Sequence, residues 1–202
     1  MAKLIPLADE LLGLHLTKSQ EDAFEYYLTE LKRWNQNINL TRILDSQDIL
    51  VQHFLDSLSC LLPISKKSDK HTTIQLVDVG SGAGFPGIPI AITSSNIDIT
   101  LVESTEKKCT FMNQMITDLK LSNARVLNER AEHLGQDSNH REHYDWAIAR
   151  AVASLPVLAE YLLPLTRLSG YCIAQKTLVS ESELSQATTV LSKLGGRLDH
   201  II

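Results

Sequence analysis

The sequence predicts an α/β fold in which a doubly wound, mostly parallel sheet follows a small helical region. Short runs of β-branched and other apolar residues recur from residue 74 onward, and amphipathic helical patterns separate most of them. A cluster of glycines follows the first run. Because strands and helices alternate, neighbouring strands are expected to run parallel. Such sheets bind ligands at the carboxyl ends of their strands, so the chemistry is expected there.

Two helices are expected before residue 74. The first, over residues 17–34, carries large apolar side chains at spacings of three or four on one face: Phe24, Leu28, Leu31 and Trp34. Thr17 with Gln20 forms a capping box at its start. The second helix is expected to run from Asp45, a favourable N-cap, to about Leu62, where Pro63 follows.

The polar stretch over residues 65–72 is predicted to be a linker. It divides the chain into an N-terminal helical subdomain, residues 1–66, and a second domain, residues 73–202. The second domain is expected to contain six strands, at 74–79, 97–103, 124–128, 144–150, 170–176 and 197–202.

Three helices are expected between these strands. One spans residues 105–120 and another begins near Pro156, with Ser154 as its cap, and continues to Leu165. The last begins with a capping box of Ser180 and Glu183 and ends at the pair of glycines 195–196.

The glycine cluster directly follows the predicted strand that ends Val77-Asp78-Val79 and consists of Gly80, Gly82, Gly84 and Gly87. Glycines allow positive φ and a close approach of the backbone to a ligand, and the helix that follows begins with free N–H groups. The last three glycines also satisfy the G-x-G-x-x-G pattern of dinucleotide sites. Asp78 instead gives an acidic-x-G-x-G-x-G pattern, typical of methyltransferases that use S-adenosylmethionine. A carboxylate at the mouth of the loop suits that cationic, amine-bearing cofactor better than a pyrophosphate.

Glu103 ends the second predicted strand, at a distance from the glycines that suits a carboxylate accepting hydrogen bonds from both ribose hydroxyls. The same spacing occurs in dinucleotide folds, so it supports a nucleoside ligand in general. The alternatives for the two features are an exposed strand-end carboxylate and a strand-to-helix turn without a ligand.

Composition limits the function classes. The formal charge of −5 over 202 residues does not favour a general nucleic-acid binder, so an RNA substrate requires locally gathered cations such as Lys107, Lys108 and Lys176. No apolar run is long enough to span a membrane. The three cysteines show no metal-ligand spacing, so no metal is expected and a reduced, cytoplasmic setting is the simplest interpretation.

Four blocks of the sequence resemble the bacterial ribosomal RNA small subunit methyltransferase G family, also called the glucose-inhibited division protein B family. The glycine loop, residues 77–89, is similar to its cofactor loop. The other three blocks are Trp34-Asn35 leading to Asn39-Leu40-Thr41, His53-Phe54-Leu55-Asp56-Ser57, and Arg150-Ala151-Val152-Ala153-Ser154-Leu155. They occur in the family's order over about residues 20–176. The resemblance implies a Rossmann-like class I methyltransferase fold.

The resemblance also implies an activity and a site. The family methylates N7 of a guanosine in the 530 loop of 16S rRNA with S-adenosylmethionine, so 16S rRNA or the small ribosomal subunit is the expected partner. The implied cofactor-binding residues are Asp78, Gly80, Gly82, Gly84, Phe85, Glu103, Ser104, Thr105, Ala131, Glu132 and Arg150. Candidates on the substrate side are Asn39, His53, Asp56 and Lys176.

Each of these candidates has a plainer interpretation. Arg150 holds the cofactor, an RNA phosphate or a guanine edge, or else it pairs with a surface carboxylate. His53 and Asp56 share a helix face and, on spacing alone, form a surface hydrogen bond. Asn39 and Thr41 suit a turn between helices.

Guanine N7 carries an in-plane lone pair and no proton, so its methylation needs alignment and electrostatics but no general base. The chain accordingly lacks an Asn-Pro-Pro-aromatic motif after its fourth predicted strand, and it has no Pro-Cys pair. No catalytic acid or base is therefore expected. The open alternatives are a methyltransferase that acts on a small molecule or a protein, and a non-catalytic partner-binding module.

The sequence departs from the family at its end. Members usually continue past the sixth strand into a terminal strand, whereas this sequence stops at Ile202. The usual last strand is therefore expected to be missing, which would leave an unpaired sheet edge.

Overall fold

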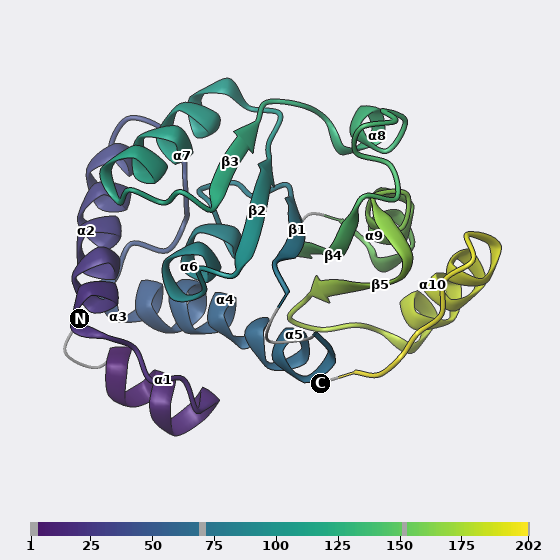
Figure 1. Ribbon diagram of the computed structural model, residues 1–202, viewed down its shortest axis with the longest axis horizontal. Coiled ribbons are helices and arrows are strands. Elements are labelled where there is room, and N and C mark those ends of the chain that lie inside the picture. The colour runs from purple at the N-terminus through teal and green to yellow at the C-terminus, as the bar shows by residue number, and fades with distance from the viewer. Residues whose placement is uncertain (1–3, 69–71, 151–152, 202) are drawn as a thin grey trace.

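A parallel sheet forms the centre of the molecule (Figure 1). The computed structural model describes residues 4–68, 72–150 and 153–201. Within them the sheet has five strands in the order β3-β2-β1-β4-β5, and every neighbouring pair is parallel. The strands are β1 (Ile74–Val79), β2 (Ile97–Val102), β3 (Ala124–Leu127), β4 (Tyr144–Arg150) and β5 (Thr166–Gln175).

The strand order reverses between β1 and β4, since the chain builds outward from β1 to β3 and then returns to the other side of β1. The carboxyl ends of β1 and β4 therefore lie at the switch point where open α/β sheets bind their ligands. The first five predicted strands are confirmed, although β5 begins four residues earlier than expected.

Helices cover both faces of the sheet because side chains alternate between two apolar clusters. One face packs against α2 (Lys18–Asn35), α6 (Gly87–Thr93) and α7 (Glu106–Asp118) through residues such as Leu76, Ile99 and Leu101. The other face packs against α8 (Ala131–Leu134) and α9 (Leu155–Leu162) through Val77, Val79 and Ala149. The last helix, α10 (Glu181–Lys193), packs on α9.

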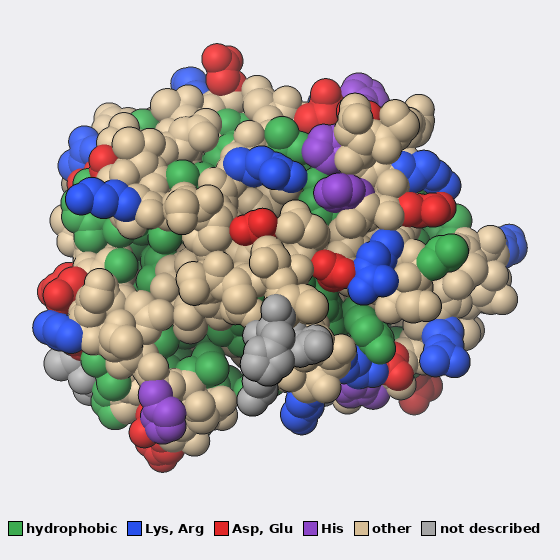
Figure 2. Space-filling model, viewed as in Figure 1, with side chains coloured by type: hydrophobic (Ala, Val, Ile, Leu, Met, Phe, Trp, Pro, Cys, Tyr) green, Lys and Arg blue, Asp and Glu red, His purple; other side chains and the backbone are tan. Residues whose placement is uncertain are grey.

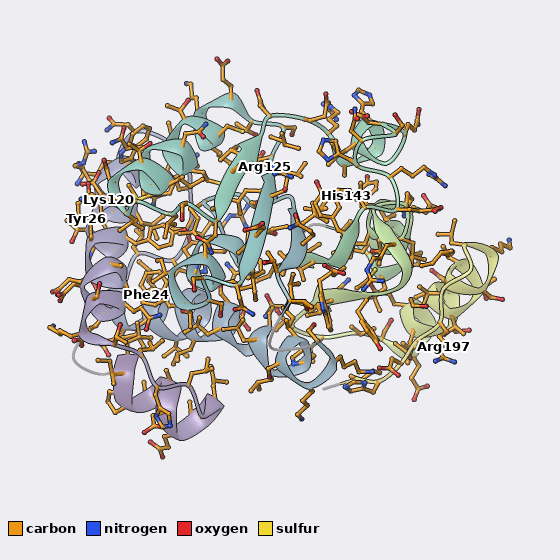
Figure 3. All side chains as sticks on the ribbon, in the orientation of Figure 1. Phe24, Tyr26, Lys120, Arg125, His143 and Arg197 are labelled. Atoms are coloured by element: carbon orange, nitrogen blue, oxygen red, sulfur yellow. The ribbon has the colours of Figure 1, made fainter. Side chains whose placement is uncertain are left out.

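The predicted amphipathic helix over 17–34 is α2. Phe24 and Leu31 are buried in the first cluster, and Leu28 and Trp34 pack against it. Both bonds of the capping box form, from Gln20 N to Thr17 Oγ1 at 3.3 Å and from Thr17 N to Gln20 Oε1 at 2.8 Å. Figure 3 shows Tyr26 and Lys120 at the outer edge of this layer, where α2 meets the end of α7.

The second predicted helix begins after Asp45 but does not end at Pro63. It is a run of α3 (Ser46–Ile49), a π-helix (Leu50–Leu55), α4 (Asp56–Ser59) and α5 (Leu61–Lys67). Pro63 lies in the first turn of α5, where a missing N–H group costs little, so the helix continues. The start of the predicted linker, through Lys67, is therefore helical, and residues 69–71 lie outside the described residues. A further helix, α1 (Leu4–Leu12), had no counterpart in the sequence prediction.

The predicted strand over 197–202 is wrong for the residues that the structure describes, which extend to residue 201. After α10 ends, the segment runs back toward α5, where Asp199 pairs with Lys67 instead of placing its backbone along β5 (Figure 1). In the described part of the chain β5 is thus an edge strand. None of the helices in that part is long and apolar enough to span a bilayer.

Two core clusters therefore enclose the sheet, and the first joins residues of the N-terminal helices to residues of the sheet without a break. The proposed division into residues 1–66 and 73–202 stays a prediction.

Candidate cofactor and substrate site

The glycine loop connects β1 to α6 at the switch point. Gly82 has φ of +60° and an added Cβ there would meet only Gly80 O, at 3.9 Å, so it would project into the open cleft. Gly84 has φ of +95°, and a Cβ there would lie 2.4 Å from Ile88 Cδ1 and 2.9 Å from the Tyr27 hydroxyl oxygen. Both positions thus require glycine, one for backbone conformation and the other also for packing.

Asp78 lies beneath this loop, not at its mouth as expected. Its side chain is fully buried, and Oδ2 accepts a hydrogen bond of 2.9 Å from Gly87 N. Burial raises the pKa of this carboxyl to about 7, against the opposing effects of the Gly87 N–H, the Arg150 charge and the Ser81 hydroxyl. Asp78 therefore ties the start of α6 to the end of β1. Its assignment to the cofactor stays a prediction.

Glu103 is joined directly to the glycine loop. It is only 7% exposed, its Oε2 accepts from Gly82 N at 3.0 Å and its Oε1 accepts from Thr105 N at 2.9 Å. The exposed strand-end alternative is therefore wrong. A carboxylate has about four lone-pair sites, so these two bonds leave acceptor capacity on Glu103.

The remaining predicted cofactor residues lie at the carboxyl ends of β2 and β3. Ser104 and Thr105 are exposed between β2 and α7, and Ala131 begins α8 after β3. The Glu132 carboxylate accepts a hydrogen bond of 3.0 Å from the Tyr161 hydroxyl of α9. Its own backbone N–H and then Tyr161 lower its pKa, against the effect of burial. The structure thus brings these residues to one edge of the sheet.

Arg150, at the end of β4, contacts two of the four substrate-side candidates, His53 and Asp56. Its Nη1 donates to Gln52 O at 2.9 Å and to Asp56 Oδ2 at 3.0 Å, and its Nη2 lies 3.1 Å from His53 Nδ1. The guanidinium carbon is 5.1 Å from the centroid of the Phe85 ring. We call Arg150, His53, Asp56 and Phe85 the Arg150 cluster.

His53 is held as a neutral ring by this cluster. Because Arg150 donates to Nδ1, the ring proton is on Nε2, which donates to Thr41 Oγ1 at 2.7 Å. Burial, followed by the Arg150 charge, lowers the His53 pKa to about 4. The ring stacks on Phe85 with centroids 4.5 Å apart and an interplanar angle of 17°. His53 therefore carries no charge near pH 7.

Asn35 organises the turn before α3, a role that the sequence analysis gave to Asn39 and Thr41. Its Oδ1 accepts from Leu40 N at 2.8 Å and from Thr41 N at 2.9 Å, and its Nδ2 donates to Thr41 O. Asn39 is exposed. Thr41 does contribute, because its hydroxyl accepts from Ile43 N and binds His53. The position of Asn35 inside the matched Trp34-Asn35 block was the available signal.

Lys176 is paired within the protein. Its ammonium donates to Ala153 O at 3.2 Å and forms an ion pair with Glu183, and its side chain is 17% exposed. Glu183 Oε1 also accepts from Leu155 N at 2.7 Å. The second predicted capping box is therefore only half formed, because this carboxylate is used elsewhere. Of the R-A-x-A-S-L block, Ala151 and Val152 lie outside the described residues.

Tyr27 was missed by the sequence analysis. Its side chain is fully buried, and its hydroxyl donates to Ala83 O in the glycine loop. Its ring stacks on Phe85 with centroids 5.3 Å apart. The available signal was its place on the apolar face of the helix over 17–34, three residues after Phe24 and four before Leu31.

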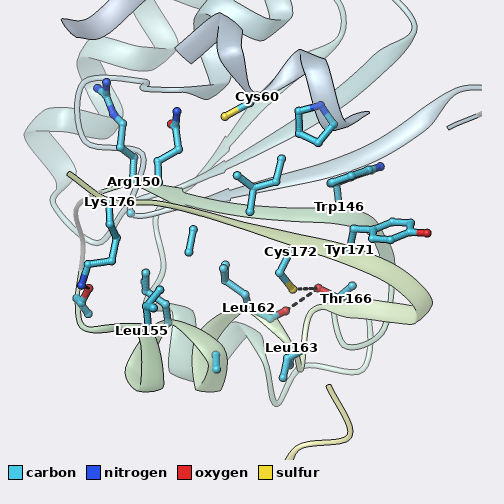
Figure 4. A pocket seen from close by; sticks show the side chains of 18 of the residues that line it. Cys60, Trp146, Arg150, Leu155, Leu162, Leu163, Thr166, Tyr171, Cys172 and Lys176 are labelled. Carbon is cyan, nitrogen blue, oxygen red and sulfur yellow. Dashed lines mark hydrogen bonds between the residues drawn. The ribbon is translucent and has the colours of Figure 1, made fainter. Parts of the chain in front are cut away.

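A cleft runs from the glycine loop past the Arg150 cluster and along β5 toward α10. Figure 4 shows Arg150 and Lys176 at one end of this cleft and Trp146 with Tyr171 at the other. No group of His, Cys, Asp and Glu side chains suited to a metal ion occurs in the part of the chain that the structure describes.

Comparisons with known proteins agree with this geometry. The family model described as rRNA small subunit methyltransferase G matches residues 20–201. A relative of that name from Desulforamulus reducens is 44% identical over 186 residues, which are 92% of this chain and 76% of the relative. Another from Roseiflexus sp. is 46% identical over 92% of this chain and 77% of the relative.

Solved structures are similar in fold. An S-adenosylmethionine-dependent methyltransferase from Aquifex aeolicus gives a TM-score of 0.53 at 14% identity, covering 87% of this chain and 91% of that one. The [4+2]-cyclase SpnF gives 0.54 at 15% identity, covering 88% and 72%. The predicted Rossmann-like class I methyltransferase fold is thus confirmed.

Proposed function

The chain belongs to the rRNA small subunit methyltransferase G family, and from this premise we propose that it methylates N7 of a guanosine in the 530 loop of 16S rRNA. It is an S-adenosylmethionine-dependent rRNA methyltransferase. One observation carries the proposal: the glycine loop, tied to Glu103 on one side, and the Arg150 cluster, which shares Phe85 with the loop, line the same cleft.

The residues present fit the cofactor. The absence of a side chain at Gly82 leaves open space beside the loop, and the Glu103 carboxylate retains acceptor capacity next to that space. We assign Glu103, Ser104 and Thr105 to the ribose and Ala131 and Glu132 to the adenine. The residues assigned to the methionine part are Gly80, Gly82, Gly84, Phe85 and Arg150, and Asp78 supports the loop from below.

The chemistry required of the protein is modest. When bound, S-adenosylmethionine supplies an electrophilic methyl group on a sulfonium centre. Guanine N7 has no proton to lose, so the enzyme has to align the base and stabilise charge. A His53 ring with a pKa of about 4, both of whose nitrogens are bound by Arg150 and Thr41, suits a site without a general base.

The surface favours a substrate held by local contacts. The chain has a net charge of −5, and on the face seen in Figure 2 the Lys and Arg side chains are interspersed with acidic ones instead of forming one patch. Bulk attraction to RNA is therefore weak. We propose that 16S rRNA is recognised in the cytoplasm, alone or within the small ribosomal subunit, through contacts gathered around the cleft.

Mapping of N7-methylguanosine in 16S rRNA tests this function. RNA from cells without the gene should lack the modification in the 530 loop, and expression of this chain should restore it. The same modification pattern in cells with and without the gene would refute the proposal. Transfer of methyl groups to free small substrates, with none to 16S rRNA or small subunits, would point to another acceptor. Calorimetry that shows no heat with S-adenosylmethionine would point to a non-catalytic module.

A further inference from the structure

Asp56 occupies a distinctive place on the wall of the cleft. It begins α4, and its Oδ2 is held at 3.0 Å by Arg150 Nη1 from the end of β4. Its main-chain oxygen accepts a hydrogen bond of 2.8 Å from Gln175 Nε2 at the end of β5. The side chain is nevertheless 46% exposed and lines the cleft. The carboxylate is therefore fixed in position while it remains open to a ligand.

The carboxylates of Asp78, Glu103 and Glu183 are buried or bound within the protein. Asp78 is fully buried, and both oxygens of Glu103 accept from backbone N–H groups. Glu183 binds Lys176 and Leu155 N. Asp56 differs, because only its Oδ2 is bound by a group within the described residues. Its Oδ1 therefore has no partner among the described residues, and its Oδ2 keeps a second lone pair.

We propose that the Asp56 carboxylate accepts hydrogen bonds from N1–H and the N2 amino group of the target guanine, and so selects guanine over other bases. The inference rests on the proposed function. The Watson–Crick edge of guanine presents these two donors side by side, which matches the paired acceptors of a carboxylate. Adenine presents an acceptor at N1, which a carboxylate repels.

The position of Asp56 also suits this role. N1 and N2 lie on the side of the purine away from N7, so the group that binds them has to stand about a ring's width from the methyl group. Asp56 belongs to α4 and not to the glycine loop, and Arg150, which binds its Oδ2, also lies against Phe85 of that loop. The guanidinium on Oδ2 fixes the direction of the carboxylate, which geometric selection of a base requires.

The test compares guanosine with inosine, which lacks only the N2 amino group. Single-turnover methylation would be measured on 16S rRNA ligated from transcripts and a synthetic segment carrying either nucleoside at the target position. The wild-type chain should methylate the guanosine substrate about tenfold faster or more, as expected for one hydrogen bond to a charged acceptor. In Asp56→Ala this preference should fall to about onefold.

Asp48→Ala is the matched control. It removes the same charge from an exposed position on α3, two helical segments earlier and outside the cleft, so it should keep the wild-type preference. Calorimetry with S-adenosylmethionine shows whether Asp56→Ala is folded and retains its cofactor site. The ratio of the rate on guanosine to the rate on inosine is compared within one variant, so a general loss of activity does not change it.

The outcomes separate the two proposals. A preference that is absent from the wild type, or equal in the wild type and Asp56→Ala, overturns the role of Asp56 while methylation of the guanosine substrate upholds the proposed function. Failure of the wild type to methylate the guanosine substrate, despite binding the cofactor, overturns the proposed function itself.

Discussion

Tyr27→Phe should weaken both the fold and cofactor binding through a single atom. The Tyr27 hydroxyl is buried and donates to Ala83 O, and Ala83 is itself only 2% exposed. Removing the hydroxyl leaves that carbonyl buried without its partner, which costs about 1–3 kcal/mol. The stacking of the ring on Phe85 and Phe54 is retained, so little packing is lost.

Because Ala83 O belongs to the glycine loop, part of the lost free energy should destabilise the loop conformation that binds the cofactor. A loss of about 1.4 kcal/mol in that conformation weakens binding about tenfold. Urea denaturation measures the free energy of unfolding, and calorimetry measures the affinity for S-adenosylmethionine.

Tyr26→Phe is the matched control, since it removes the same atom from the neighbouring residue. Tyr26 is 40% exposed at the outer edge of α2 (Figure 3), and its hydroxyl donates to Asp118 Oδ2 at 2.7 Å. Its loss should cost less than about 1 kcal/mol and leave the affinity unchanged. If Tyr27→Phe lowers stability but binds the cofactor as tightly as the wild type, the hydroxyl does not support the loop.

Three further outcomes can be measured. Gly84→Ala should lower the free energy of unfolding by about 2 kcal/mol or more and impair cofactor binding, because the added Cβ would collide with Ile88. Gly13→Ala also has a positive φ, of +64°, but nothing lies within 4 Å of its Cβ, so it should lower that free energy by only about 1 kcal/mol. Equal losses for the two variants in urea denaturation would contradict the packing argument. The pKa of Asp78 is about 7 in the folded protein, against an ordinary value of 3.8 for the unfolded chain, so the folded form holds its proton more tightly and stability should fall as pH rises from about 4 to about 7. Asp78→Asn should lack this fall, and identical stability profiles of the two proteins between those pH values would refute it. The nitrogen-15 NMR signals of His53 should show a neutral ring protonated at Nε2 at pH 7, and an imidazolium only near pH 4; a charged ring at pH 6 would contradict the assigned tautomer.

Local patterns in the sequence predicted the central strands and the loop between β1 and α6, since alternation, glycine spacing and caps act over a few residues. The same reasoning failed at Pro63, whose place in the first turn of a new helix has no local signature. It also failed at residues 197–201, where Leu198 and Ile201 follow two glycines but Asp199 pairs with Lys67 and the segment does not join the sheet.

Most contacts between the residues of the site could not be predicted from the sequence. The pattern indicated Arg150 by itself and placed His53 with Asp56 on one helix face, but the bonds that join Arg150 to both span more than ninety residues. The burial of Asp78 depends on the packing of α6 over β1, so its position relative to the strand did not reveal that it lies under the loop. The position of Glu103 beside the glycine loop could be predicted, because the end of β2 and the loop after β1 are neighbours in any sheet of this order.

The stack of Tyr27, Phe85 and His53 bears on how far the protein can be reduced in size. Each ring comes from a different part of the chain, and the middle one belongs to the cofactor loop itself. A fragment that begins at the linker would keep the five strands of the sheet and the four glycines of the loop but would expose Phe85 and release Ala83 O. The glycine loop therefore does not keep its conformation as an isolated segment of this protein, because the helices that precede it supply contacts that hold it in place.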